Sequence, residues 1–138
     1  MASGVLYCYI DGAARGNPGP AGIGVIITDQ DGAVLREIAR YLGETTNNVA
    51  EYRAILAALE EALRRGAEEV VIYSDSELLV RQLLGTYRVR SAHLLPLFRR
   101  ARELMGRFRR VTVRHIGRER NARADRLANR AIDEKLNT

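Results

Sequence analysis

Apolar and polar positions along the chain form two kinds of pattern. Short, nearly continuous apolar runs bounded by turn residues are typical of strands that are buried in a sheet. Apolar residues three or four positions apart are typical of helices with one buried face. The predicted strands are residues 5–10, 22–28, 34–41, 69–74 and 111–115. The predicted helices are residues 49–65, a short helix from the Asp75-Ser76 cap to Leu84, residues 91–105 and residues 121–136.

Turn residues show how these elements are connected. Asp29-Gln30-Asp31-Gly32 predicts a hairpin between the second and third strands, which then pair antiparallel. Residues 45–48, Thr-Thr-Asn-Asn, supply capping side chains for the first helix, and Gly66 ends that helix. We therefore expect a mixed α/β sheet flanked by helices, with the hairpin as an antiparallel edge. The first strand and the two strands after the hairpin are expected to form its parallel centre.

Four acidic residues lie directly beside or within the apolar segments that predict the core. Asp11 follows the first strand, and Asp75 follows the fourth after one serine. Glu51 and Asp125 lie on the apolar stripes of two helices, near their first turns. A turn, a cap or the positive end of a helix dipole would explain each acid alone. One shared site at the carboxyl ends of the strands explains all four together.

Such a cluster points to bound cations. Carboxylates at the edge of a core are unfavourable unless they are paired, and four of them close together repel strongly. One or two divalent ions would relieve that repulsion. Ligands that are all oxygen suit Mg²⁺, with Mn²⁺ as a substitute.

Composition limits the class of protein. A chain of 138 residues with 46% apolar and 28% charged residues predicts one globular domain, residues 1–138, and a monomer is the default. No apolar run reaches membrane-spanning length, and the first residues lack a secretory pattern, so we expect a cytoplasmic protein without a membrane partner. The single cysteine, Cys8, lies within an apolar strand and is expected in the core.

The net charge of +5 is unevenly distributed. Residues 78–123 contain 13 arginines, no lysine and only two acids. Such a segment favours one side of the molecule that faces a polyanion. The alternative is an ordinary solvated helix face, and charge alone does not separate the two.

Four segments, in order, resemble the motifs of ribonuclease H type 1, in its form without a hybrid-binding domain. They are Tyr9-Ile10-Asp11-Gly12-Ala13-Ala14-Arg15-Gly16-Asn17-Pro18-Gly19-Pro20, Thr45-Thr46-Asn47-Asn48-Val49-Ala50-Glu51-Tyr52, Tyr73-Ser74-Asp75-Ser76 and Asn121-Ala122-Arg123-Ala124-Asp125-Arg126-Leu127-Ala128. The resemblance covers nearly the whole chain. It implies a five-stranded mixed sheet and metal-dependent cleavage of the RNA strand of an RNA/DNA hybrid, leaving 5′-phosphate and 3′-hydroxyl ends.

The resemblance also suggests roles for individual residues. Our hypothesis for a two-metal site makes Asp11 the bridging ligand, with Glu51 and Asp75 at the leaving-group metal and Asp125 at the nucleophile metal. His115 or Arg118 would assist product departure. The candidate substrate contacts are Gly12, Asn17, Thr46, Asn47 and Asn48.

The chain departs from some members of this family in two places. It has no Trp, and residues 85–90 replace the basic protrusion that those members insert. Glu77 stands where many members have Gln. Two other functions remain open at this point. One is a non-catalytic nucleic-acid-binding paralogue, against which the complete set of four acids argues. The other is a nuclease of the same fold acting on double-stranded RNA or branched DNA.

Overall fold

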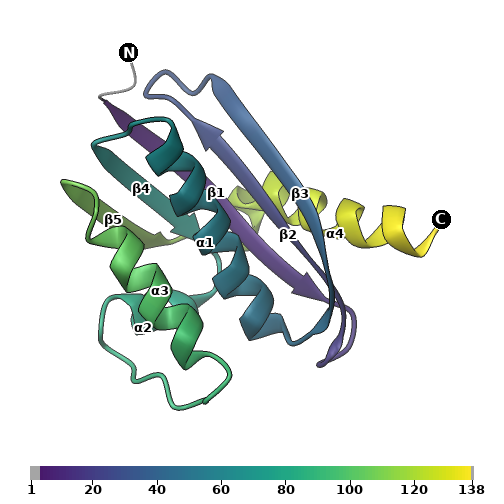
Figure 1. Cartoon of the computed structure of the whole chain (residues 1–138). Coiled ribbons are helices and arrows are strands. Elements are labelled where there is room, and N and C mark those ends of the chain that lie inside the picture. The colour runs from purple at the N-terminus through teal and green to yellow at the C-terminus, as the bar shows by residue number, and fades with distance from the viewer. Residues whose placement is uncertain (1–3, 138) are drawn as a thin grey trace.

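A computed structural model describes residues 4–137 as a five-stranded sheet with helices on both faces (Figure 1). The strands are β1 (Val5–Ala14), β2 (Gly19–Thr28), β3 (Val34–Thr45), β4 (Glu69–Ser74) and β5 (Arg110–His115). The helices are α1 (Asn47–Arg64), α2 (Glu77–Leu83), α3 (Leu95–Met105) and α4 (Ala122–Leu136), with a 3₁₀ turn at Arg118–Arg120. The predicted mixed fold is confirmed.

The strand order is β3-β2-β1-β4-β5. β1 pairs antiparallel with β2 and parallel with β4, and β4 pairs parallel with β5. The predicted antiparallel hairpin at one edge is therefore confirmed. The expectation of a parallel centre is correct for β1 and β4 but not for β5. That strand forms the second edge of the sheet, and most of its side chains are exposed or only half-buried.

Several element boundaries differ from those predicted. β1 and β2 extend through the glycine- and alanine-rich positions between them, because strand pairing continues as far as Ala14 and Ala21. β3 reaches Thr45 rather than Tyr41. α3 begins at Leu95, four residues later than predicted, because Pro96 lacks an amide hydrogen and fits only in the first turn of a helix.

Helices α1 and α4 enclose the middle of the sheet from opposite sides (Figure 1). Leu6, Cys8 and Ile10 of β1 belong to the core that includes the apolar face of α1. α4 packs on the other face, against β1, β2 and β3. Gly24 of β2 permits this contact, since a Cβ atom there would lie 2.0 Å from the carbonyl oxygen of Ala124. The two helices thereby bring residues from both faces to one end of the sheet.

The start of α1 is set by Thr46. The Thr46 side chain accepts a hydrogen bond of 3.2 Å from the amide of Val49, which caps the helix. Asn47 and Asn48, also predicted as cap candidates, are instead the first two residues of the helix. Because the helix begins earlier than predicted, Glu51 lies in its second turn rather than its first.

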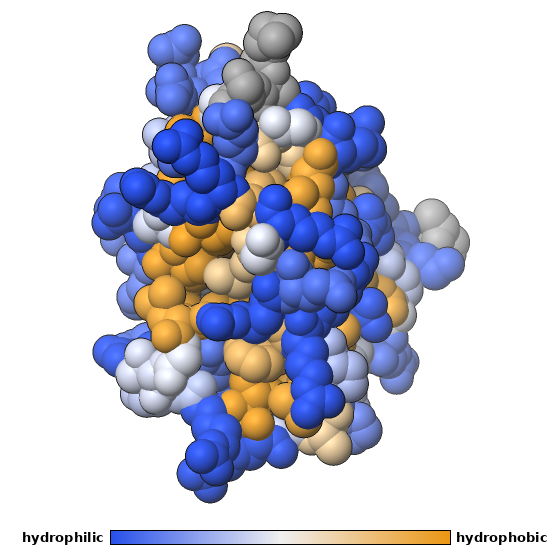
Figure 2. Space-filling view, turned by 60° about the vertical axis from the view of Figure 1, so that its left-hand side comes forward, coloured by the Kyte–Doolittle hydropathy of each residue, from blue (hydrophilic) through white to orange (hydrophobic). Residues whose placement is uncertain are grey.

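Within residues 4–137, no helix has the length and apolar character needed to cross a membrane. Figure 2 turns the β5 side of the molecule toward the viewer and shows apolar surface bordered by strongly hydrophilic side chains. Large apolar side chains that are exposed include Leu78 in α2 and Leu84 and Tyr87 directly after it.

Candidate active site

Asp11 and Asp75 lie side by side because β1 is longer than β4. The two strands pair in parallel as far as Ile10 and Ser74, where β4 ends. Asp11 is the next residue of β1, and Asp75 begins the turn after β4. The sequence predicts Asp11 at the end of a strand, but in the structure it lies within β1. From Asp11 onward, no strand pairs with β1 on its β4 side. The parallel register brings both carboxylates to the same point.

Glu51 reaches this point from α1, which lies unusually close to β1. A Cβ atom on Gly12 would lie 2.3 Å from the backbone carbon of Ala50, so only glycine permits this approach. The Gly12 amide donates a 3.0 Å hydrogen bond to Oε1 of Glu51. Gly12 thus fixes the orientation of the Glu51 side chain, in addition to its predicted place near a substrate.

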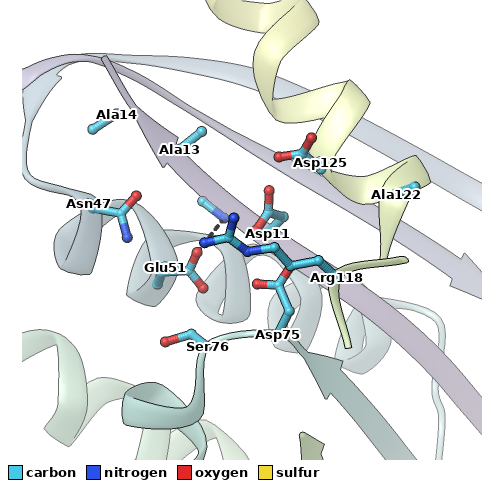
Figure 3. A pocket seen from close by; sticks show the side chains of 11 residues that line it. Asp11, Ala13, Ala14, Asn47, Glu51, Asp75, Ser76, Arg118, Ala122 and Asp125 are labelled. Carbon is cyan, nitrogen blue, oxygen red and sulfur yellow. Dashed lines mark hydrogen bonds between the residues drawn. The ribbon is translucent and has the colours of Figure 1, made fainter. Parts of the chain in front are cut away.

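Three carboxylates converge in the structure. Asp11, Glu51 and Asp75 each have an oxygen within 4.8 Å of the other two. They line a cavity of about 470 Å³, into which Asn47, Arg118 and Asp125 also project (Figure 3). Figure 3 shows that these side chains come from separate elements on both faces of the sheet. Three of the four predicted acids therefore converge on one point at the edge of the sheet.

Asp125 lies at the margin of this cluster. It lines the same cavity from the first turn of α4 but is not among the three converging carboxylates. The pattern of α4 predicted a position on the buried stripe, yet Asp125 is exposed. Its Oδ1 accepts a 3.2 Å hydrogen bond from Asn129, one turn later in the helix. Its exposure leaves Asp125 open to solvent and to a substrate.

The electrostatics of the cluster are strongly unfavourable without a cation. Burial, the charges of Glu51 and Asp75, and a side-chain hydrogen bond with Asp125 together raise the pKa of Asp11 to about 10. Burial likewise raises the pKa of Glu51 to about 8, although the Gly12 amide opposes this. In the absence of cations, this coupled pair therefore takes up protons more readily than free carboxylates do.

The residues present fit a divalent metal ion. All the converging atoms are carboxylate oxygens, the ligand type that Mg²⁺ and Mn²⁺ prefer. Oε2 of Glu51 is buried and has no hydrogen-bond partner among the described residues. A buried carboxylate oxygen without a partner is unfavourable, and coordination to a cation would satisfy it.

The structure separates the two candidates for an assisting group. Arg118 lines the cavity, and in Figure 3 its side chain extends across the site. His115 ends β5, is exposed, and is not among the residues that line the cavity. Geometry therefore favours Arg118 over His115 for a role at this site.

Of the five candidate substrate contacts, Gly12 and Asn47 line the cavity, and Asn17, Thr46 and Asn48 do not. Asn47 lines the cavity, and its amide donates a 3.0 Å hydrogen bond to Oδ1 of Asn17 in the loop between β1 and β2. Asn17 and Asn48 are exposed. The Thr46 hydroxyl oxygen accepts the capping hydrogen bond. The structure thus brings Asn47 to the carboxylates and places Asn17 next to Asn47 through the hydrogen bond between them.

Sequence reasoning missed one residue that positions the site. Asn121 is 1% exposed, and its Nδ2 donates a 2.8 Å hydrogen bond to the carbonyl oxygen of Ile10. This bond ties the start of α4 to β1 one residue before Asp11, so it sets where Asp125 can lie. Asn121 opens the fourth motif of the sequence, but nothing in that motif indicated that its side chain bonds to β1.

Comparison with known proteins identifies a family whose members share this sequence pattern and fold. Residues 9–131 match the family model described as reverse transcriptase-like. The crystal structure of RNase H1 from the halophilic archaeon Halobacterium salinarum is 41% identical to this chain with a TM-score of 0.91. The match covers 94% of this chain and 98% of that one. The chain belongs to the ribonuclease H family.

Two further relatives belong to the same group. LC11-RNase H1, solved in complex with an RNA/DNA hybrid, is 47% identical with a TM-score of 0.89, and the match covers 95% of this chain and 99% of that one. The bifunctional protein Rv2228c of Mycobacterium tuberculosis is 45% identical over 124 residues, which is 89% of this chain. The chain spans only about a third of the length of that relative, 34%.

Proposed function

We propose that this chain is an endoribonuclease that hydrolyses the RNA strand of RNA/DNA hybrids with divalent metal ions, and that residues 1–138 act as one ribonuclease H domain. The observation that carries the proposal is the convergence of Asp11, Glu51 and Asp75 within 4.8 Å, with Asp125 beside them. The solved complex of LC11-RNase H1 with an RNA/DNA hybrid supports the choice of substrate.

Two bound ions, Mg²⁺ or Mn²⁺, would supply an activated water and neutralise charge on the phosphate and the leaving oxygen, giving 5′-phosphate and 3′-hydroxyl ends. Asp11, at the centre of the cluster, would bridge both metal positions. Glu51 and Asp75 would hold the position on the leaving-group side. Asp125, exposed on α4, would complete the position on the nucleophile side.

Polar residues at the cavity and next to it support recognition of a hybrid. Asn17, Asn47 and Asn48 offer amide groups that can bond to base edges and 2′-hydroxyls in a wide, shallow minor groove. Phosphates and 2′-hydroxyls recur at each nucleotide of an RNA strand, so cleavage is expected to be largely independent of sequence. Binding is expected to weaken as salt concentration rises.

A cleavage assay tests the reaction and the site together. An end-labelled RNA/DNA hybrid would be compared with double-stranded RNA and double-stranded DNA, in Mg²⁺, in Mn²⁺ and in chelator. We expect metal-dependent cutting of the hybrid's RNA strand, abolished by Asp75→Asn and retained by Asp31→Asn. Asp31 is an exposed acid in the β2–β3 turn and serves as the matched control.

Either of two results would overturn the proposal. Folded protein that binds the hybrid but cuts nothing with either metal would be a non-catalytic paralogue. Faster cutting of double-stranded RNA than of the hybrid would identify a different nuclease of the same fold.

The same assay separates Arg118 from His115. We expect Arg118→Ala to slow multiple-turnover cleavage at least about tenfold, because a positioned cation near developing or departing phosphate charge contributes on that scale or more. We expect His115→Ala to leave the rate nearly unchanged, since His115 does not line the cavity. The reverse ranking would show that a rearrangement on substrate binding brings His115 into the site.

A further inference from the structure

One face of the sheet is covered over only part of its width. α4 makes its contacts with β1, β2 and β3. The face of β4 and β5 on that side remains open, since Arg114 there is exposed and Thr112 and Tyr73 are only half-buried. Alternate residues of these strands, such as Ile72 and Val113, face the core on the opposite side.

Three tyrosines lie next to one another on this open face. Tyr9 of β1 is the register partner of Tyr73 of β4. Their rings stack with centroids 4.8 Å apart and planes 25° from parallel. Tyr7 also stacks with Tyr73, with centroids 6.5 Å apart and planes 12° from parallel. We call these three residues the tyrosine platform. All three are half-buried, so part of each ring remains accessible.

Arginines border the tyrosine platform. Arg114 is the register partner of Tyr73 on β5. Burial and the neighbouring tyrosines raise the pKa of Tyr73, whereas the charges of Arg114 and Arg120 oppose this, which places both cations near the ring. Within residues 4–137, neither arginine is in an ion pair. Two positive charges beside the tyrosine platform thus lack a protein partner.

A hollow continues the tyrosine platform toward α4. A cavity of about 460 Å³ lies beside Tyr9 and is lined also by Arg120, Arg123 and Arg126. Two acids are close: Glu119 lines the cavity, and Glu37 pairs with Arg123 at 3.3 Å. The arginines still outnumber these acids, so the hollow and the tyrosine platform together carry net positive charge.

We propose that the tyrosine platform, with Arg114 and Arg120, is a binding surface for single-stranded nucleic acid. Aromatic rings that are partly accessible, beside arginines without an ion pair, suit a single strand, because bases stack on the rings while cations bind the phosphates. A duplex keeps its bases stacked inside and offers no free base faces for such rings. The charge of the surface favours a polyanion over a second copy of this basic chain.

The tyrosine platform and the candidate active site use neighbouring residues of β1 and of the end of β4. Tyr9 and Tyr73 precede Asp11 and Asp75 by two residues each. A single-stranded extension leaving a hybrid at the carboxylates would therefore pass over the neighbouring rings. This role for an extension rests on the proposed function, but binding of a free single strand does not.

Equilibrium binding tests the inference without any cleavage. The probe is a fluorescent single-stranded DNA of about 12 nucleotides that cannot self-pair, measured by anisotropy in chelator. We expect Tyr73→Leu, which keeps apolar bulk but removes stacking, to weaken binding by about 5- to 100-fold. Arg114→Gln should weaken binding and reduce its salt dependence by about one phosphate contact.

Two controls sharpen the test. Arg36→Gln removes an exposed arginine of β3 that has no ion pair among the described residues, and should leave single-strand binding unchanged. Cleavage of a blunt hybrid should be unaffected by Tyr73→Leu and Arg114→Gln. Because Arg114 is exposed, its substitution should not disturb folding.

Three results would overturn the inference. The first is that the wild type binds the single strand no more tightly than Tyr73→Leu and Arg114→Gln do. The second is equal weakening of single-strand and blunt-hybrid binding by both variants. The third is a change of oligomeric state in Tyr73→Leu without a change in single-strand binding, which would identify a protein interface. None of these results bears on whether the chain hydrolyses hybrids.

Discussion

Asp11→Asn is expected to stabilise the metal-free protein while abolishing its activity. Asp11 is 5% exposed and lies among other carboxylates, which together with burial raise its pKa to about 10. Asparagine has the shape of a protonated aspartate and cannot ionise. The substitution therefore removes the unfavourable proton uptake that folding imposes on Asp11 at pH 7, without changing the packing around β1.

The size of this effect follows from proton linkage. An acid whose pKa is raised by folding takes up a proton on folding, so the free energy of unfolding falls as pH rises from about 4 toward 10. At about 1.4 kcal/mol per pH unit above the unfolded value of 3.8, the ceiling at pH 7 is roughly 4 kcal/mol. Glu51 shares the same protons and solvent enters the cavity, so we expect a gain of about 2 kcal/mol.

The assay is urea denaturation followed by circular dichroism, in chelator, near pH 4 and at pH 7. The stability advantage of Asp11→Asn should be present at pH 7 and nearly absent near pH 4. Asp31→Asn, an exposed acid outside the cluster, should show no advantage at either pH. Adding Mg²⁺ at pH 7 should raise the stability of the wild type and not that of Asp11→Asn, because binding to the folded state stabilises it.

Equal stability of Asp11→Asn and wild type in chelator at pH 7 would refute this reasoning, since the carboxylates would then not repel appreciably. An advantage that is as large near pH 4 as at pH 7 would point to packing rather than ionisation as its source.

Three further predictions concern the frame around the site. Gly24→Ala should destabilise the protein by about 2–3 kcal/mol in urea denaturation and lower its activity, because the added Cβ would meet the backbone of α4. Gly4→Ala, with open space around residue 4, should change neither stability nor activity. Tyr52→Phe should cost about 1 kcal/mol or more in the same assay, because it removes a 2.6 Å hydrogen bond to Oε1 of buried Gln82. Burial raises the pKa of Cys8 to about 12, so iodoacetamide at pH 8 should label it only after unfolding, as mass spectrometry would show.

The sequence alone predicted most of the elements and the acids from which the chemistry of the site is proposed. Apolar runs, 3.6-residue periodicity and turn residues depend on local geometry, so they located the strands, the helices and the β2–β3 hairpin. The order and spacing of four motifs identified the acids and the family. Element ends were less well predicted, as at Ala14 and Leu95, because pairing and proline geometry decide them.

Only the tertiary structure decided how these residues relate in space. That β1 outruns β4 by several residues, and so brings Asp11 beside Asp75, depends on strand register, which no local pattern encodes. The choice of Arg118 over His115 at the cavity depends on the path of the loop after β5. The tyrosine platform likewise depends on tertiary structure. The pairing of β1 with β4 brings the rings together, and α4 packs on β1, β2 and β3 rather than over β4 and β5. Residue identity determined which functional groups the chain carries, and long-range packing determined which of these groups lie together in one site.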